Sequence, residues 1–269
     1  MRGILLLILL ALTAPLAAAT RVVSLAPSLS EIVVELHSAD LLVGVLEGGE
    51  NLPELAGVPS VGRYGQIDME RLLSLKPDLL LLWPGSVPAA QRDQLKRLGI
   101  PTYSAEPHGL DELITQIEAI GVQMGRAEQG QQRAQQLRQQ LQALRERYHR
   151  DQPLRVFYQV WDKPLYTVGG GQIVSDALEV CGARNVFAEL SIPAPQVSLE
   201  SVLLHNPEVI LAGDQIQLDA WKAWPQVDAV RHERLLLVPD KGLERPSGQM
   251  IEATARLCQL LAAKAPASK

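Results

Sequence analysis

Aromatic residues are few in this chain, and three of them lie where strands are expected to end. The 269 residues include 4 Trp, 5 Tyr and 2 Phe. Tyr64 lies in a glycine-containing connection, Trp83 ends an apolar run, and Trp161 ends a similar run in the second half. Exposed rings at such positions would stack on a flat, partly apolar ligand. The alternative is that each ring only covers a hydrophobic core.

A charged loop follows the expected strand 235–238 and precedes the last expected helix. Its residues are Lys241, Gly242, Leu243, Glu244 and Arg245. In sheets of parallel strands, ligands bind beyond the carboxyl ends of the strands, which is where this loop is expected. Its charged side chains would hydrogen-bond amides or carboxylates of a ligand. A salt-bridged surface turn would contain the same residue types.

The sequence shows no arrangement of residues typical of an enzyme. It contains no Gly-x-Ser-x-Gly elbow, no P-loop and no Gly-x-Gly-x-x-Gly that opens a helix after a strand. The five histidines lack the spacing of metal ligands, and Gly169–Gly171 is typical of a turn. We therefore predict a binding protein without catalytic residues, cofactor or metal site. A periplasmic hydrolase, the alternative, would need a nucleophile and a base.

Two glutamates occupy matching positions in two similar segments. Residues 67–79 and 197–209 share one pattern, in which Glu70 and Glu200 lie 130 positions apart. Each follows an expected helix N-cap by two residues, and the helix dipole alone would explain one acid there. Two exposed carboxylates on two similar lobes would also suit two basic sites on a symmetric partner.

The N-terminus predicts export. Arg2 precedes an apolar run from Ile4 to Leu12, and Ala17 to Ala19 offer a cleavage site. The run is shorter than the roughly 18 residues that cross a bilayer, although an uncleaved anchor helix is the alternative. We expect a signal peptide over 1–19, cleavage near Ala19 and a periplasmic protein.

The charge of the mature chain argues against a nucleic-acid partner. Removal of 1–19 takes away one arginine and no acid, which changes the formal net charge from −5 to −6. Basic and acidic residues are interleaved, so we expect no nucleic-acid partner.

Cys181 and Cys258 are the only cysteines. In an oxidising compartment they predict a disulfide, with two buried thiols as the alternative.

Strands and helices alternate in both halves of the chain, which predicts an α/β fold of two lobes with mainly parallel sheets. The N-terminal lobe is expected over 20–109 and the C-terminal lobe over 151–269. Between them, residues 110–150 favour helix almost throughout, with apolar residues at helical spacing. We predict one long helix there that joins the lobes, although its glycines would allow a kink.

Several segments resemble the periplasmic cobalamin-binding proteins of ABC importers, which belong to the helical-backbone class of substrate-binding proteins. The resemblance covers nearly the whole mature chain. The matching segments are Arg21–Ser28, Glu70–Arg71, Leu75–Leu79, Leu178–Gly182, Asn185–Phe187 and Pro195–Ser198 with Glu200.

This resemblance implies two Rossmann-like lobes flanking one rigid helix, with cobalamin or another corrinoid held between them. It implies that Glu70 and Glu200 dock onto arginines of the permease dimer, which works with ATPase subunits, and that Cys181 pairs with Cys258. We expect a monomer. The alternative ligands within the class are ferric siderophores and haem.

Three positions depart from the family pattern. Ala194 stands where a tryptophan is usual, the loop at Gly48 and Gly49 lacks a tyrosine, and Gly242 replaces an aromatic residue. Fewer rings leave a different corrinoid or a cobinamide precursor as alternative ligands.

Overall fold

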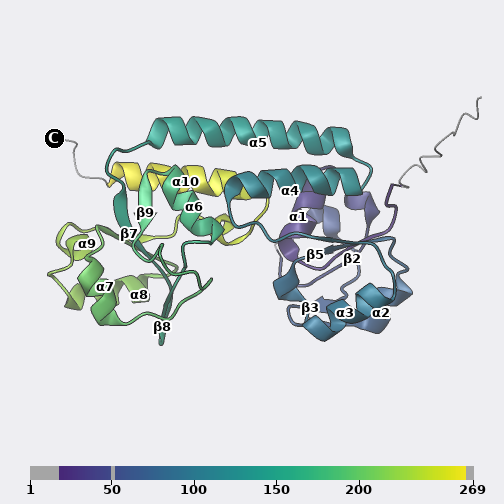
Figure 1. Cartoon of the computed structure of the whole chain (residues 1–269), viewed down its shortest axis with the longest axis horizontal. Coiled ribbons are helices and arrows are strands. Elements are labelled where there is room, and N and C mark those ends of the chain that lie inside the picture. Colours follow the sequence, from purple (N-terminus) through teal and green to yellow (C-terminus); the bar gives the residue numbers. More distant parts are fainter. Residues whose placement is uncertain (1–17, 50–51, 265–269) are drawn as a thin grey trace, which may run out of the picture.

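The computed structural model describes residues 18–49 and 52–264, which form two lobes side by side under a layer of helices (Figure 1). The prediction of an α/β fold with two lobes and mainly parallel sheets is confirmed. The expected signal peptide lies almost wholly outside the described residues. Among the residues that are described, no helix is long and apolar enough to cross a membrane.

The N-terminal lobe contains a parallel sheet in the order β2-β1-β5-β6. The strands are β1 Val22–Ser24, β2 Leu42–Val45, β5 Leu79–Leu82 and β6 Thr102–Ser104, with a small hairpin of β3 Gly62–Arg63 and β4 Gln66–Ile67. Its helices are α1 Pro27–Glu35, α2 Met69–Ser74 and α3 Ala89–Arg97, with the 3-10 turns η1 Ala39–Leu41, η2 Pro53–Leu55 and η3 Pro84–Ser86.

Helices cover both faces of this sheet. Leu79 and Leu81 of β5 belong to the core beneath α1, whereas Leu80 and Leu82 belong to a second core beneath α2 and α3. Because successive side chains of a strand point to opposite faces, a strand that is buried on both faces is apolar throughout. This explains why β5 consists of four leucines.

The C-terminal lobe repeats this order as β9-β7-β10-β11. Its strands are β7 Leu154–Asp162, β8 Leu165–Thr167, β9 Ala183–Asn185, β10 Val209–Ala212 and β11 Leu235–Leu237. Its helices are α6 Ile173–Val180, α7 Leu199–His205, α8 Gln215–Ala220, α9 Asp228–Arg231 and α10 Gln249–Ala263, with the 3-10 turns η4 Trp221–Ala223 and η5 Lys241–Glu244. The sequence did not indicate β8, which pairs antiparallel with the end of β7.

The similarity of the lobes extends to individual hydrogen bonds. The backbone N–H of Arg21 donates to Asp78 Oδ1 at 2.9 Å, and that of Arg155 donates to Glu208 Oε2 at 3.0 Å. Each arginine side chain also donates to carbonyl oxygens just beyond the end of a helix, Arg21 at α2 and Arg155 at α7. The two halves therefore share one way of fastening the first strand to the helix-to-strand unit.

The prediction of one long helix over 110–150 is wrong. The segment forms α4 Leu110–Gln123 and α5 Ala127–Tyr148, which pack against each other. The chain reverses at Gly125, whose φ of +69° favours glycine. Near the reversal the two helices touch, because a Cβ on Gly121 would lie 2.8 Å from Gly130 Cα. These glycines permit a close helix pair where the sequence suggested a kink.

Both lobes are joined by this helical layer. Helix α5 spans the molecule, above α4 on one side and α10 on the other (Figure 1). A single core cluster contains Ile114 of α4, Leu137 of α5 and Leu257 of α10, together with residues of α1 and α6. Continuous apolar packing from lobe to lobe predicts limited movement between them.

The predicted disulfide is confirmed. Cys181 and Cys258 are bonded, with their Cα atoms 4.5 Å apart. The bond links the end of α6 to α10 and lies within the fully buried core. It therefore fastens the last helix to the C-terminal lobe.

Candidate ligand-binding cleft and docking helices

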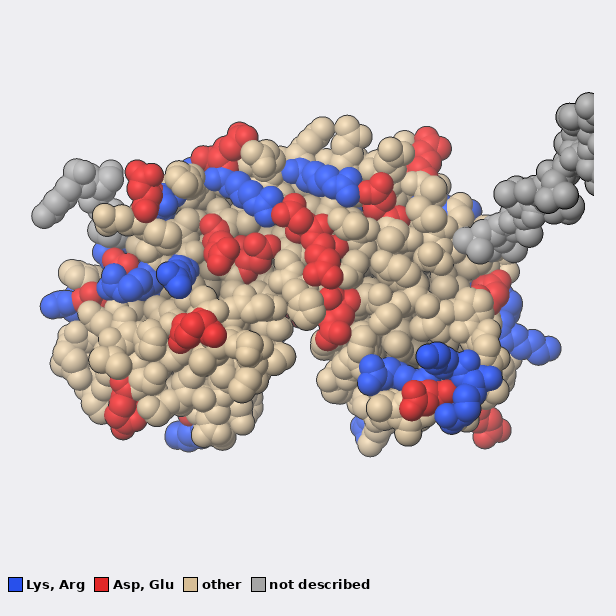
Figure 2. Space-filling model, in the orientation of Figure 1, with Lys and Arg blue, Asp and Glu red and all other residues tan. Residues whose placement is uncertain are grey.

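A deep notch separates the two lobes on the side opposite α5 (Figure 2). The segments that follow the last strand of each parallel sheet make contacts across the lobe boundary. After β6 the chain reaches Leu110, whose N–H donates to Asp176 Oδ2 of the other lobe at 2.6 Å. After β11 it reaches Arg245, which pairs with Glu31 of α1. The notch is therefore a candidate for the cleft in which the carboxyl ends of parallel strands bind a ligand.

Tyr64 and Trp83 form an exposed aromatic pair in the N-terminal lobe. Their ring centroids lie 5.9 Å apart with an interplanar angle of 54°, and their residues are 61% and 36% exposed. Tyr64 lies between β3 and β4, and Trp83 follows β5. The N–H of Gly65 donates to Ser86 O at 3.0 Å, which ties the hairpin to the turn after β5. Two rings held this way offer an apolar surface to a flat ligand.

Trp161 is the exposed ring of the C-terminal lobe. It lies near the carboxyl end of β7 and is 57% exposed. Its antiparallel partner in β8 is Tyr166, which is half-buried. Residues directly opposite each other in such a pair point to the same face of the sheet. Tyr166 is thus a further candidate, which only the short apolar run 165–167 after Pro164 could have indicated.

The loop predicted to bind ligand is divided between surface and core. Lys241 and Glu244 are exposed, whereas Leu243 is fully buried in the core and Gly242 is buried beside Asp240, which caps the turn. Arg245 contacts Glu31 across the lobe boundary at 3.3 Å. The side chains of this loop available to a ligand are therefore those of Lys241 and Glu244.

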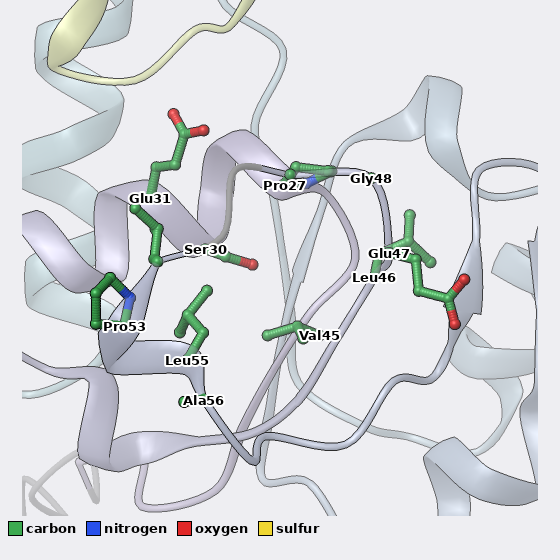
Figure 3. A pocket seen from close by; sticks show the side chains of 12 residues that line it. Pro27, Ser30, Glu31, Val45, Leu46, Glu47, Gly48, Pro53, Leu55 and Ala56 are labelled. Atoms are coloured by element: carbon green, nitrogen blue, oxygen red, sulfur yellow. The ribbon is translucent and has the colours of Figure 1, made fainter.

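A pocket of about 510 Å³ lies in the N-terminal lobe, between α1 and residues 45–49 and 52–56. Ser30, Val45 and Leu55 surround it, and the carboxylate of Glu31 points away from the two apolar side chains (Figure 3). Gly48 and Gly49, where the sequence lacks a tyrosine, also line it.

Glu70 and Glu200 occupy equivalent places on α2 and α7. Asp68 Oδ1 accepts from the Arg71 N–H at 2.9 Å, and Ser198 Oγ accepts from the Ser201 N–H at 3.1 Å, which confirms both predicted N-caps. Both glutamates are exposed. The backbone N–H of Glu200, and then the Ser198 hydroxyl, lower the pKa of the Glu200 carboxyl.

Helices α2 and α7, the candidate docking helices, lie on the side of the molecule opposite α5, one on each lobe (Figure 1). The 130-residue repeat in the sequence is therefore also a spatial repeat. It places one exposed glutamate on each lobe.

Residues 22–241 match the model of a family described as periplasmic binding proteins. The chain belongs to this family. It is 35% identical over 246 residues to a vitamin B12-binding protein of Vibrio cholerae, a match that covers 90% of this chain and 89% of the relative. A vitamin B12-binding protein of Yersinia pseudotuberculosis is 35% identical over 264 residues, covering 97% and 93% of the two chains.

Solved structures agree with this family assignment. The periplasmic vitamin B12 binding protein BtuF of Vibrio cholerae superposes with a TM-score of 0.83 at 34% identity, covering 91% of this chain and 98% of that one. A periplasmic haem-binding protein solved with two haems, BhuT, reaches a TM-score of 0.80 at 20% identity, covering 92% and 99%. At that identity the second likeness shows the fold alone.

Proposed function

We propose that this chain captures cobalamin or a related corrinoid between its lobes and delivers it to an ABC importer. The exposed rings of Tyr64 and Trp83 on one lobe and Trp161 on the other carry this proposal, because they would line the cleft. A corrin ring is a large flat ligand with amide side chains. Aromatic faces would pack on the ring, and Lys241 and Glu244 would bind the amides.

The relatives support the same ligand class. Both curated relatives named above bind vitamin B12 by name, and each match spans about nine-tenths of both chains. Ligand specificity within a shared fold depends on the site residues, so we rest the choice of ligand on the rings rather than on the fold.

Docking would use Glu70 and Glu200. Two exposed carboxylates at equivalent places on similar lobes match a permease dimer, because a two-fold symmetric partner presents the same basic site twice. Ion pairs of this kind guide association and fix orientation. We propose that the monomeric protein carries the ligand to the permease and that ATP hydrolysis by its ATPase subunits drives release.

Export would place the protein in the periplasm. Cleavage after Ala19 would give Thr20 the new amino group, and the Thr20 nitrogen already lies 2.9 Å from Asp78 Oδ2. A charged ammonium group there would pair with this carboxylate. N-terminal sequencing of the protein recovered from periplasm tests this step, with Thr20 as the expected first residue.

The ligand is tested by titrating the mature protein with cyanocobalamin, cobinamide, haem and a ferric siderophore, followed by tryptophan fluorescence. We expect the two corrinoids to quench the fluorescence with dissociation constants below about 10 μM. If only haem or the siderophore binds saturably, that molecule is the ligand and the corrinoid proposal is wrong. The protein should leave each ligand chemically unchanged, since we propose no catalytic role.

A further inference from the structure

Two acidic residues of α1 face the C-terminal lobe. Glu31 and Glu35 are one helical turn apart, so their side chains share one face of α1. Opposite them lies the segment 245–249, which leads from η5 into α10. This contact joins parts of the chain that are more than 200 residues apart, because Ser247 and Glu31 are separated by 216 positions.

Glu31 is held by two groups of the other lobe. The Ser247 hydroxyl donates to Glu31 Oε2 at 2.8 Å, and Arg245 Nη1 lies 3.3 Å from Glu31 Oε1. The side chains of Glu31 and Arg245 are only 2% and 22% exposed. The stability of a carboxylate buried to this extent depends on the groups that pair with it, because water cannot take their place.

Glu35 makes a second contact in the same place. Arg133 of α5 donates to Glu35 Oε2 at 3.3 Å, and the N–H of Gln249 also donates to the Glu35 carboxylate. Gly248 lies so close that a Cβ there would be 2.1 Å from Glu35 Oε2. The φ of Gly248 is −59°, which any residue adopts, so close approach is the reason for glycine at this position.

We propose that Glu31, Arg245 and Ser247 form an interlobe clasp that sets the separation of the two lobes. Rotation of either lobe would draw Arg245 and Ser247 away from a buried carboxylate, which is costly. Arg245 is then a positioning residue for the cleft and does not itself bind the ligand. This differs from the sequence-based prediction, which grouped Arg245 with the ligand contacts.

The clasp adjoins the pocket of the N-terminal lobe. Glu31 lines the 510 Å³ pocket, while its carboxylate is turned toward the C-terminal lobe (Figure 3). If the clasp were loosened, fewer molecules would hold the two lobes at the separation that binds the ligand. The apparent affinity for the ligand falls with that fraction. The effect on ligand affinity rests on the proposed function, whereas the effect on lobe separation does not depend on any ligand.

The experiment measures the distance between the lobes by pulsed electron paramagnetic resonance. Spin labels are attached through Gln94→Cys in α3 and Ala220→Cys in α8, which are exposed positions on different lobes. The two native cysteines are bonded to each other and do not react. The variants are Arg245→Gln and Ser247→Ala, and circular dichroism checks that each is folded.

Arg138→Gln serves as the matched control. It removes an arginine that pairs with Glu118 at 2.7 Å, but this pair joins α5 to α4 and does not involve the segment 245–249. Ser247 is fully buried, so Ser247→Ala affects a ligand only through the clasp.

We expect Arg245→Gln and Ser247→Ala to broaden the distance distribution of the ligand-free protein, while Arg138→Gln leaves it unchanged. Both clasp variants should weaken cyanocobalamin binding by about three- to tenfold.

An unchanged distance distribution in both folded variants, Ser247→Ala and Arg245→Gln, would overturn the proposal. If only Arg245→Gln weakens binding and distances stay the same, Arg245 contacts the ligand. A wild-type protein that binds no corrinoid contradicts the proposed function, yet the distances still test the clasp.

Discussion

The rings of Tyr64 and Trp83 lie 5.9 Å apart at an angle of 54°, one on the β3–β4 hairpin and the other directly after β5. Neither ring is stacked flat on the other, and both residues are exposed. The pair is held by backbone contacts, because Gly65 donates to Ser86 O and the ring of Trp83 lies over Gly85. Substitution of either ring should therefore affect the ligand more than the fold.

Trp83→Ala should weaken cyanocobalamin binding by about tenfold, since an anchoring ring commonly contributes more than 1 kcal/mol. Trp161→Ala should act in the same direction from the other lobe. Trp83→Phe, which keeps a ring, should retain most of the affinity. Calorimetric titration measures each constant. Val122→Ala, at an exposed apolar position of α4, provides the control. Equal affinities for Val122→Ala and Trp83→Ala would show that Trp83 does not contact the ligand.

Glu70→Lys and Glu200→Lys should each abolish corrinoid uptake while leaving the dissociation constant unchanged. The reason is that both carboxylates are exposed on the docking helices, and reversal of charge there repels a basic site on the permease. Uptake is measured with radiolabelled cyanocobalamin in cells that depend on this protein.

Glu146→Lys is the control for charge reversal, because Glu146 is exposed on α5, away from the docking helices (Figure 1). It should leave uptake unchanged. Loss of ligand binding in either docking variant would instead make that glutamate part of the binding site or of the fold.

Asp78→Asn should lower stability at neutral pH. Partial burial tends to raise the pKa of Asp78, but the N–H groups of Thr20 and Arg21 outweigh it and hold the pKa below its usual value. An acid with a lowered pKa stabilises the fold above its unfolded pKa of about 3.9, and this stabilisation is lost as the pH falls through the folded pKa.

The free energy of unfolding of wild type should therefore exceed that of Asp78→Asn by about 1 kcal/mol at pH 7. Solvent screening keeps this difference small. The difference should shrink as the pH falls below 4. Urea unfolding at several pH values measures both proteins. A difference that grows toward acid pH would contradict the assigned direction of the pKa shift.

Features that depend on neighbouring residues were predictable from the sequence, whereas several contacts between distant segments were not. Asp68 and Ser198 act as N-caps through contacts within three residues, so their type and spacing were sufficient. The four leucines of β5 likewise signalled a buried strand. The repeat at Glu70 and Glu200 correctly indicated two similar lobes, since elements that pack in the same way need similar residues at the same spacing.

The errors came from contacts that depend on tertiary packing. The reversal at Gly125 divides an expected helix, because Gly121 and Gly130 allow α4 and α5 to touch. No local pattern distinguishes such glycines from a kink. The partner of Arg245 is Glu31, in the other lobe, and its separation in sequence concealed it. For the same reason Leu243 was expected near a ligand although it packs in the core.

Reduction of the Cys181–Cys258 disulfide should lower the free energy of unfolding by about 4 kcal/mol, because the bond closes a long loop of the unfolded chain between cysteines with a sequence separation of 77. Corrinoid affinity should persist in the folded reduced protein, since the bond links α6 to α10 within the core. Urea unfolding with and without reductant measures the change. Equal midpoints would show that helix packing alone holds α10 in place.

The central claim is that a single corrinoid binds in the cleft between the lobes, and calorimetric titration of the mature protein with cyanocobalamin tests it most directly. We predict one molecule bound per chain, with a dissociation constant below about 10 μM that Trp83→Ala and Trp161→Ala both raise. Absence of saturable binding in wild type, or affinity that neither substitution alters, would contradict it.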